Sequence, residues 1–502
     1  MPEHLRALVV VLILSGLVLV AVRPSFAALL GAATVQRWRN AWLGLSLLAF
    51  LAPNFWIFAM LSGLWLLVSL RREIGGIVGF YLLVLFAVPP ATIQVPGLGL
   101  INYLIDLSYP RLLSLVLLLP AALLLRQQKD RWRLGATWPD KCLLAYVLLR
   151  AVLEFRATNV TNALRGCFYL LLDVWLPYYV VSRSVRSLEA FKAALSGMVL
   201  AGLLLASMGM FEYLKSWKLY SAMVANLRLE WGLGGYLGRA GNLRASASVG
   251  HSIAYGYVLL VCWGLYFFLQ EQISRPWMRK LGSLLLLGGL VASLSRGPWI
   301  GAMTCLLVFL ATGPRALAKI TGVVAAGAIS IPMLMMFPAG QRMVDLLPFV
   351  GTVETENIDY RTRLLDNALV VIQRNLWLGS ESYMSTPEMQ SMIQGEGIID
   401  IVNTYVGTAL DYGIVGLALF IGVLLGNVWT VWQCQKRWPL DSTEKLLGRA
   451  LLASMAGVMV TIFTVSSISL IPTVYWCLAG LCLAYTQTFR SRPWPNVPST
   501  GY

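Results

Sequence analysis

Charged residues and histidines are scarce in this chain. Charged residues make up 12% of the 502 residues, where a soluble domain has about 25%, and hydrophobic residues make up 58%. Histidine occurs twice, as His4 and His251, and the seven cysteines show neither a disulfide framework nor a zinc-ligand spacing. These scarcities argue against a soluble globular protein, a disulfide-rich secreted domain and a zinc-binding domain.

Apolar runs of membrane-spanning length recur along the whole chain. We therefore predict an all-α fold, a polytopic integral membrane bundle of about 12 to 16 spans, because lipid leaves backbone groups only internal hydrogen-bond partners. The stretch 41–70 is interrupted by "APN" and predicts two spans, while 24–35 predicts a short or re-entrant piece. The first apolar segment is interpreted as a retained span and not as a cleaved signal.

The net charge of +16 lies mostly in short connections between apolar segments. This is the positive-inside pattern of a membrane protein and not a nucleic-acid-binding face, and it places the loops 212–250 and 337–400 and the turn at Arg296 on the outer side. The 337–400 loop carries nine acidic residues, four arginines and no lysine. The 212–250 loop keeps five basic residues against two acidic ones, which an anionic ligand would explain.

Two short motifs place arginines on this outer side. The motif "GRAGNLRASASVGH" contains Arg239 and Arg244, whose planar guanidinium groups suit phosphate, although the same residues could anchor the loop at the membrane interface. The motif "VASLSRGPWIGA" contains Arg296 between two apolar segments, either as a ligand contact or as a simple stop charge. The outward position favours a ligand for Arg244 and Arg296, with Arg239 as the weaker candidate.

The exit of the long outer loop predicts a surface helix. Residues 362–374 form an amphipathic pattern with Leu365, Leu369 and Ile372 on one face. Arg361 and Arg363, at the start of this pattern, are further candidate substrate-binding residues.

Three residues are candidates for proton transfer or for supporting it. Asp400 stands at a helix entrance in "IIDIVNTYVGTALDYG", with Asn403 beside it, and is either a helix cap or a catalytic carboxylate. His251 is a base, a ligand contact or a structural histidine at a helix start.

The motifs "RASASVGHSIAYGYVL", "SLSRGPWIGA" and "DYRTRLLDNALVVIQRNLWLG", followed by "IDIVNTYVGTALDYGIVGL", resemble successive signatures of the O-antigen ligase and O-antigen polymerase superfamily. The resemblance covers roughly residues 190–430, and it is strongest to the polymerase-like members of exopolysaccharide clusters. The order, spacing and common outward topology of the motifs carry it, since each motif alone is degenerate.

The resemblance implies a metal-independent glycosyltransferase of the GT-C type, without a cofactor, in the bacterial inner membrane with its active site facing the periplasm. Such an enzyme moves a saccharide from undecaprenyl diphosphate to another lipid-linked repeat in a polymerase, or to lipid A-core in a ligase. Its partners would be the undecaprenyl-diphosphate-linked oligosaccharide, membrane lipids and a chain-length regulator or export complex, and no nucleic acid. The family's diphosphate-binding arginines match Arg244 and Arg296 here.

One position departs from the ligase pattern. In many ligases the exit of the large loop carries a His-Asn pair whose histidine is the base, and the matching pair here is Val402-Asn403. This departure counts against a ligase and leaves the base open between Asp400 and His251. The rival classes are a lipid-linked saccharide transporter, which would have related halves and broken helices near the bilayer midplane, and a scaffold of a secretion complex, in which the arginines would be dispensable.

The same topology predicts four parts of the chain. They are N-terminal transmembrane helices at 1–190, a transmembrane core at 191–336 with the first periplasmic loop at 212–250, a large periplasmic loop at 337–404, and C-terminal transmembrane helices with a cytoplasmic tail at 405–502.

Overall fold

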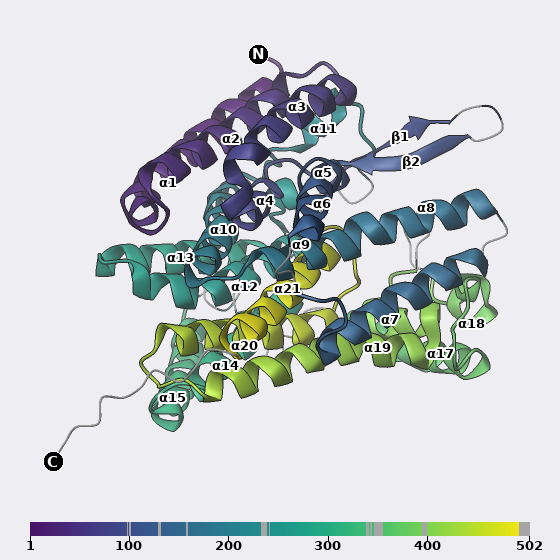
Figure 1. Cartoon of the computed structure of the whole chain (residues 1–502). Coiled ribbons are helices and arrows are strands. Elements are labelled where there is room, and N and C mark those ends of the chain that lie inside the picture. Colours follow the sequence, from purple (N-terminus) through teal and green to yellow (C-terminus); the bar gives the residue numbers. More distant parts are fainter. Residues whose placement is uncertain are drawn as a thin grey trace.

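A computed structural model gives a fold built almost entirely of helices (Figure 1). It describes residues 1–97, 99, 102–128, 132–156, 159–231, 238–239, 241–337, 341, 344–345, 355–393 and 399–490. The α-helices are α1 (Glu3–Leu30), α2 (Ala32–Leu51), α3 (Phe55–Glu73), α4 (Ile77–Val84), α5 (Tyr109–Leu113), α6 (Leu119–Gln127), α7 (Trp138–Leu153), α8 (Val160–Leu170), α9 (Leu176–Ser184), α10 (Leu188–Lys215), α11 (Ser221–Asn226), α12 (Ser252–Leu269), α13 (Pro276–Ala292), α14 (Arg296–Ala311), α15 (Ala316–Met335), α17 (Thr355–Arg374), α18 (Pro387–Gln390), α19 (Thr404–Lys436), α20 (Thr443–Phe463) and α21 (Ile471–Arg490).

Short 3₁₀ and π turns extend or interrupt these helices. The 3₁₀ turns are η1 (Ile74–Gly76), η3 (Glu154–Arg156), η5 (Ala247–Val249), η6 (Gln270–Gln272) and η7 (Tyr383–Ser385), and the π turns are η2 (Ser114–Leu118) and η4 (Leu171–Trp175). The two π turns join α5 to α6 and α8 to α9, so each pair forms one long, locally widened helix.

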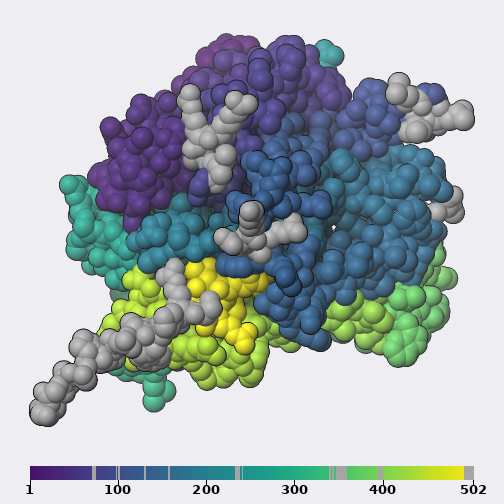
Figure 2. Space-filling view, viewed as in Figure 1, coloured from purple at the N-terminus to yellow at the C-terminus, as the bar shows by residue number. Residues whose placement is uncertain are grey.

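The strands form two small antiparallel hairpins. β1 (Thr92–Pro96) pairs with β2 (Tyr103–Ser108), and β3 (Gly238–Arg239) pairs with β4 (Asn242–Leu243). The β1–β2 hairpin projects beyond the helices, and α17 and α18 lie toward the same end, while α15 lies toward the opposite end (Figure 1). The space-filling view shows the N-terminal helices packed as one side of a continuous body (Figure 2).

Eight helices in the described part of the chain are long and apolar enough to cross a membrane. They are Glu3–Leu30, Tyr109–Gln127, Val160–Ser184, Leu188–Lys215, Ser252–Gln272, Ala316–Met335, Thr404–Lys436 and Thr443–Phe463. The chain is therefore an all-α, multi-pass membrane bundle, as its apolar runs predict. The figure of about 12 to 16 spans stays a prediction, because helices such as α13, with 17 residues, are too short to qualify by length alone.

The centre of the bundle depends on close helix packing. α12 is buried over almost its whole length, and α10 packs against it and against α4. At the α4–α10 crossing, a Cβ added at Gly197 would lie 1.9 Å from the carbonyl oxygen of Gly79. Two glycines therefore let these backbones touch, which is the usual way in which membrane helices approach closely.

α19 is broken near its start. Gly413 has φ 66° and ψ −169°, a conformation that glycine adopts without steric cost, so regular helical bonding stops there. The segment after α17 fills the gap, since the amide of Ile414 donates to the carbonyl of Leu376 at 2.8 Å. The piece after the break, residues 414–436, exceeds the roughly 20 residues that a span needs, which puts the break near one membrane surface.

Some local expectations from the sequence are met and others are corrected. The "APN" interruption does separate two helices, α2 and α3. Residues 24–35 form no re-entrant piece, because α1 continues past Pro24 to Leu30 before α2 begins. Of the expected loop 337–404, residues 338–340, 342–343, 346–354 and 394–398 lie outside the described part.

The amphipathic helix at 362–374 exists within α17, but its buried face is not the expected one. Leu364, Ala368 and Val371 are buried in a small core beneath the helix, whereas Leu365 and Leu369 are 44% and 47% exposed. The pattern misled because α17 has apolar residues on two faces and the buried face includes a small alanine. Ile372, the third expected residue, packs at the edge of this core.

Candidate functional site

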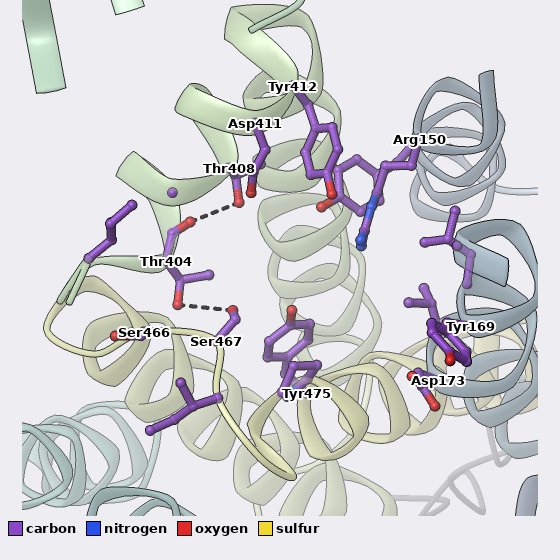
Figure 3. Close-up of a pocket in the computed structure, with 18 of the residues that line it drawn as sticks. Arg150, Tyr169, Asp173, Thr404, Thr408, Asp411, Tyr412, Ser466, Ser467 and Tyr475 are labelled. Atoms are coloured by element: carbon purple, nitrogen blue, oxygen red, sulfur yellow. Dashed lines mark hydrogen bonds between the residues drawn. The ribbon is translucent and has the colours of Figure 1, made fainter. Parts of the chain in front are cut away.

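A polar cavity of about 620 Å³ lies at the end of the bundle where α7, α8, α19 and the α20–α21 connection meet. Figure 3 shows polar side chains from several of these elements turned toward one another across it. The lining residues that carry polar groups are Arg111, Tyr146, Arg150, Glu154, Tyr169, Asp173, Tyr383, Asp400, Asn403, Thr404, Thr408, Asp411, Tyr412, Ser466, Ser467, Tyr475 and Trp476.

On one wall of the cavity an arginine and a carboxylate pair with each other. Arg111 forms an ion pair with Asp173 at 2.9 Å and stacks 3.5 Å from the ring centre of Tyr169. Asp173 lies in the π turn between α8 and α9, and a widened turn of this kind often marks a functional segment of a helix. This pair therefore gives the wall a fixed shape and little net charge.

A second wall comes from α7 and the first piece of α19. Arg150 points into the cavity, with Tyr412 and Asp411 near it (Figure 3). Its guanidinium carbon lies 4.8 Å from the ring centre of Tyr412 and 5.6 Å from that of Tyr146. Aromatic faces thus hold this cation in place.

Asp400 stands at the edge of the cavity and is tied to the α20–α21 connection. Ser466 donates a hydrogen bond of 2.6 Å to Oδ1 of Asp400, and the hydroxyl of Tyr360 donates to its backbone carbonyl. The same connection reaches the loop before α12, since Ser469 donates to the carbonyl of Val249 at 3.0 Å. Asp400 and the segment around His251 are therefore at the same end of the bundle.

The β3–β4 hairpin brings two predicted arginines to the turn before α14. Arg239 donates to the carbonyl of Leu294 at 2.7 Å, and Arg244 donates to the hydroxyl of Ser295 at 2.9 Å. Leu294 adopts φ 46°, an uncommon conformation for a residue with a side chain, so this turn is held by its surroundings. The first residue of α14, directly after the turn, is Arg296.

Arg361 joins this group from α17. Partial desolvation lowers the pKa of its guanidinium, the charge of Asp400 raises that pKa, and the charges of Arg239 and Arg296 lower it. Arg239 and Arg296 therefore act on Arg361, and the neighbouring Tyr360 links this part of α17 to Asp400 through its hydroxyl. We call Arg239, Arg244, Arg296 and Arg361 the arginine cluster. Arg363, two residues further along α17, is exposed on a different side of the helix.

His251 and Asn403 both begin helices. Nδ1 of His251 accepts the amide of Ile253 at 3.3 Å, which is the structural role considered from the sequence. Burial lowers the pKa of His251 to about 4, and the charges of Arg244 and Lys218 add to this effect, so the imidazole is neutral at neutral pH. Asn403, and not Asp400, caps α19, since its Oδ1 accepts the amide of Tyr405 at 2.9 Å.

A buried carboxylate holds the loop that carries Arg244. Glu212, near the end of α10, accepts the amides of Ser246 and Ala247 at 2.9 and 2.8 Å, and its other oxygen accepts the amide of Leu219. Three backbone donors on one carboxylate fix the path of the chain on both sides of the arginine-bearing segment.

Sequence reasoning missed Glu212 and most of the cavity. A usable signal existed for Arg150, because an arginine inside the apolar segment 139–155 is unusual and marks a functional position by default. The π turn around Asp173 and the approach of Tyr475 left no such signal, because both depend on contacts between helices distant in sequence.

The fold and this site define a polytopic helical membrane protein with a polar cavity and an arginine cluster at one end of its bundle. Residues 281–421 match the family model described as O-antigen ligase. The matched segment includes Arg296, Arg361, Asp400 and the broken part of α19, and it confirms the resemblance to the O-antigen ligase and polymerase superfamily. No protein of curated function matches the chain.

Proposed function

We propose that the chain is a polysaccharide polymerase of the GT-C type that joins undecaprenyl-diphosphate-linked oligosaccharide repeats on the periplasmic face of the bacterial inner membrane. The observation that carries this proposal is that Arg239 and Arg244 are hydrogen-bonded to the turn directly before Arg296. The charges of Arg239 and Arg296 act on Arg361, as does that of Asp400, which stands at the edge of the cavity. The match of residues 281–421 to the O-antigen ligase family supports the same kind of membrane enzyme.

The arginine cluster has the chemistry that a lipid-diphosphate donor needs. When the bond between the anomeric carbon and the diphosphate oxygen breaks, its electrons remain on the diphosphate, whose negative charge grows. Guanidinium groups fixed before the reaction stabilise that charge without reorganising. The hydrogen bonds of Arg239 and Arg244 to the turn at 293–295 fix them in this way.

Asp400 is the group best placed to receive the proton of the acceptor hydroxyl. The acceptor oxygen forms the new bond to the anomeric carbon, and its proton passes to the carboxylate. Ser466 orients Asp400 through Oδ1. His251 is less well placed to act as the base, because its Nδ1 already accepts the amide of Ile253 and caps α12.

The proposal extends to topology and partners. The four chain parts at 1–190, 191–336, 337–404 and 405–502 would place the cavity, β3–β4 and α17 on the periplasmic side. The partners would be the undecaprenyl-diphosphate-linked oligosaccharide, the surrounding lipids and a chain-length regulator or export complex.

A ligase is the second candidate, because the matched family model is described by that activity. It would use the same arginines and differ in its acceptor. The break in α19 is a feature that transporters share, but it lies near a membrane surface, whereas transporter sites use breaks near the midplane. The break therefore supports a surface site more than a transport path.

The deciding experiment is mass analysis of the products formed by the purified protein from a lipid-diphosphate oligosaccharide. We expect longer lipid-linked chains, and we expect Asp400→Asn to slow their formation by about 10²–10⁴-fold at an unchanged thermal unfolding midpoint. Transfer only to added lipid A-core would identify a ligase instead. Unchanged substrate with the wild-type protein, under conditions that keep it folded, would reject both enzymes.

A further inference from the structure

The cavity and the arginine cluster differ in charge, and this difference suits them to different parts of the substrate. Two arginines, Arg111 and Arg150, line the cavity, against four carboxylates, those of Glu154, Asp173, Asp400 and Asp411. This balance disfavours a diphosphate and suits a neutral ligand rich in hydroxyl groups. The arginine cluster has the opposite balance and suits the diphosphate.

The wall around Arg150 has unused binding capacity. Arg150 is half-buried, and the nitrogen-bearing end of its side chain is turned into the cavity (Figure 3). A guanidinium group carries several N–H donors, and those at this end can donate to a ligand oxygen. By contrast, Arg111, which also lines the cavity, is engaged by Asp173 and by the carbonyl of Asp106.

The same wall offers the other two elements of a sugar site. The rings of Tyr412 and Tyr475 border the cavity, and Figure 3 shows them on either side of the space that Arg150 enters. Asp411 adds a carboxylate that can accept hydrogen bonds from hydroxyl groups. Flat apolar faces flanked by charged hydrogen-bonding groups match a sugar ring, whose faces are apolar and whose edge carries hydroxyls.

We propose that Arg150, Asp411, Tyr412 and Tyr475 form the subsite that binds the acceptor saccharide, a neutral sugar chain, with its reacting hydroxyl directed toward Asp400. This assignment rests on the proposed function. It gives the two substrates separate sites on either side of Asp400: the diphosphate at the arginine cluster and the acceptor sugar in the cavity.

The test measures binding of each half of the substrate separately. One probe is the soluble oligosaccharide released by hydrolysis of the host's lipid-linked repeat, titrated calorimetrically into the purified full chain. The other probe is undecaprenyl diphosphate without sugar. We expect Arg150→Gln to weaken oligosaccharide binding tenfold or more and to change diphosphate binding less than threefold. Arg296→Ala should do the reverse.

Two further variants guard the interpretation. Asp411→Asn preserves side-chain shape and should also weaken the oligosaccharide, which covers the case in which Arg150→Gln misfolds. Arg374→Gln is the matched control, because that arginine pairs with Glu388 on the surface of α17, away from the cavity, and should bind both probes like wild type.

Unchanged oligosaccharide affinity in Arg150→Gln and Asp411→Asn, with normal thermal midpoints, would overturn the subsite even if the wild-type protein polymerises. Selective loss of oligosaccharide binding would support the subsite even if no polymer forms, so the two proposals can fail separately.

Discussion

Arg183 at one end of the bundle and the arginine cluster at the other end are held in different ways. At the end with the basic connections, Arg183 is 1% exposed, and its Nη2 donates to both carboxylate oxygens of Asp140 at 2.8 and 2.7 Å. The hydroxyl of Tyr178 completes this network. At the other end, Arg239 and Arg244 donate to a backbone carbonyl and a serine hydroxyl, and the charges of Arg239 and Arg296 act on Arg361.

This difference separates structural charge from functional charge. A buried arginine paired with its own carboxylate has its charge compensated within the fold, and removing one partner leaves an uncompensated charge. Like charges that gather at one place repel each other, and the grouping is stabilised when an anion joins it. Pairing therefore predicts a role in stability, and clustering predicts a role in binding.

The largest effects should come from removing one arginine of each kind. We expect Arg296→Ala to reduce turnover by about 10²–10³-fold, because one fixed donor to the developing diphosphate charge is lost, while stability changes by less than about 1 kcal/mol. Arg183→Ala should instead lower the free energy of unfolding by about 3–5 kcal/mol, because Asp140 is left buried without its partner. Turnover rates and thermal midpoints in the same detergent measure both.

The comparison fails if the two variants behave alike. Full-length polymer from Arg296→Ala at normal expression would remove the cluster from the reaction. A normal midpoint for Arg183→Ala would mean that its burial does not report a structural role.

A smaller effect should come from Glu212, which supports the cluster without belonging to it. Glu212→Gln removes a charged acceptor from buried amides, and we expect a loss of about 2–3 kcal/mol in stability and a rate loss on the order of tenfold from the shifted Arg244. Turnover should be measured at saturating and at limiting lipid substrate. A defect in substrate binding lowers turnover at limiting substrate and leaves it unchanged at saturation.

Glu189→Gln, at the exposed start of the same helix, is the matched control and should behave like wild type. Equal rates for the two glutamine variants would remove Glu212 as a positioning residue.

The bundle and the outer arginines could both be predicted from the sequence, because each is visible in the composition of a short stretch of residues. The run 189–211 became α10 and 251–270 became α12 within a few residues, and outward arginines stood out against the positive-inside pattern. The cavity could not be predicted, because its walls come from α7, α8 and α19, which are far apart in sequence. The wrong face of α17 has a similar cause, since partners elsewhere in the fold choose between its two apolar faces.

The smallest effect concerns His251, which combines a structural role with a place near the arginine cluster. Its side chain caps a helix, and the charges of Arg244 and Lys218 act on it. Its pKa is about 4 in the fold and about 6.5 in the unfolded chain, so its contribution to stability is complete above pH 6.5 and is lost as the pH falls toward 4. Relative to His251→Asn, which keeps a capping oxygen without titrating, the wild type should lose about 2 kcal/mol between pH 7 and pH 5. Thermal midpoints of both proteins across this range measure the difference. If the midpoints of the two proteins change with pH in parallel, the pKa of His251 is not lowered by the fold. The imidazole would then be as accessible to water as that of a surface histidine, and the nearby Arg244 would not lie in the water-poor site that the proposed function needs.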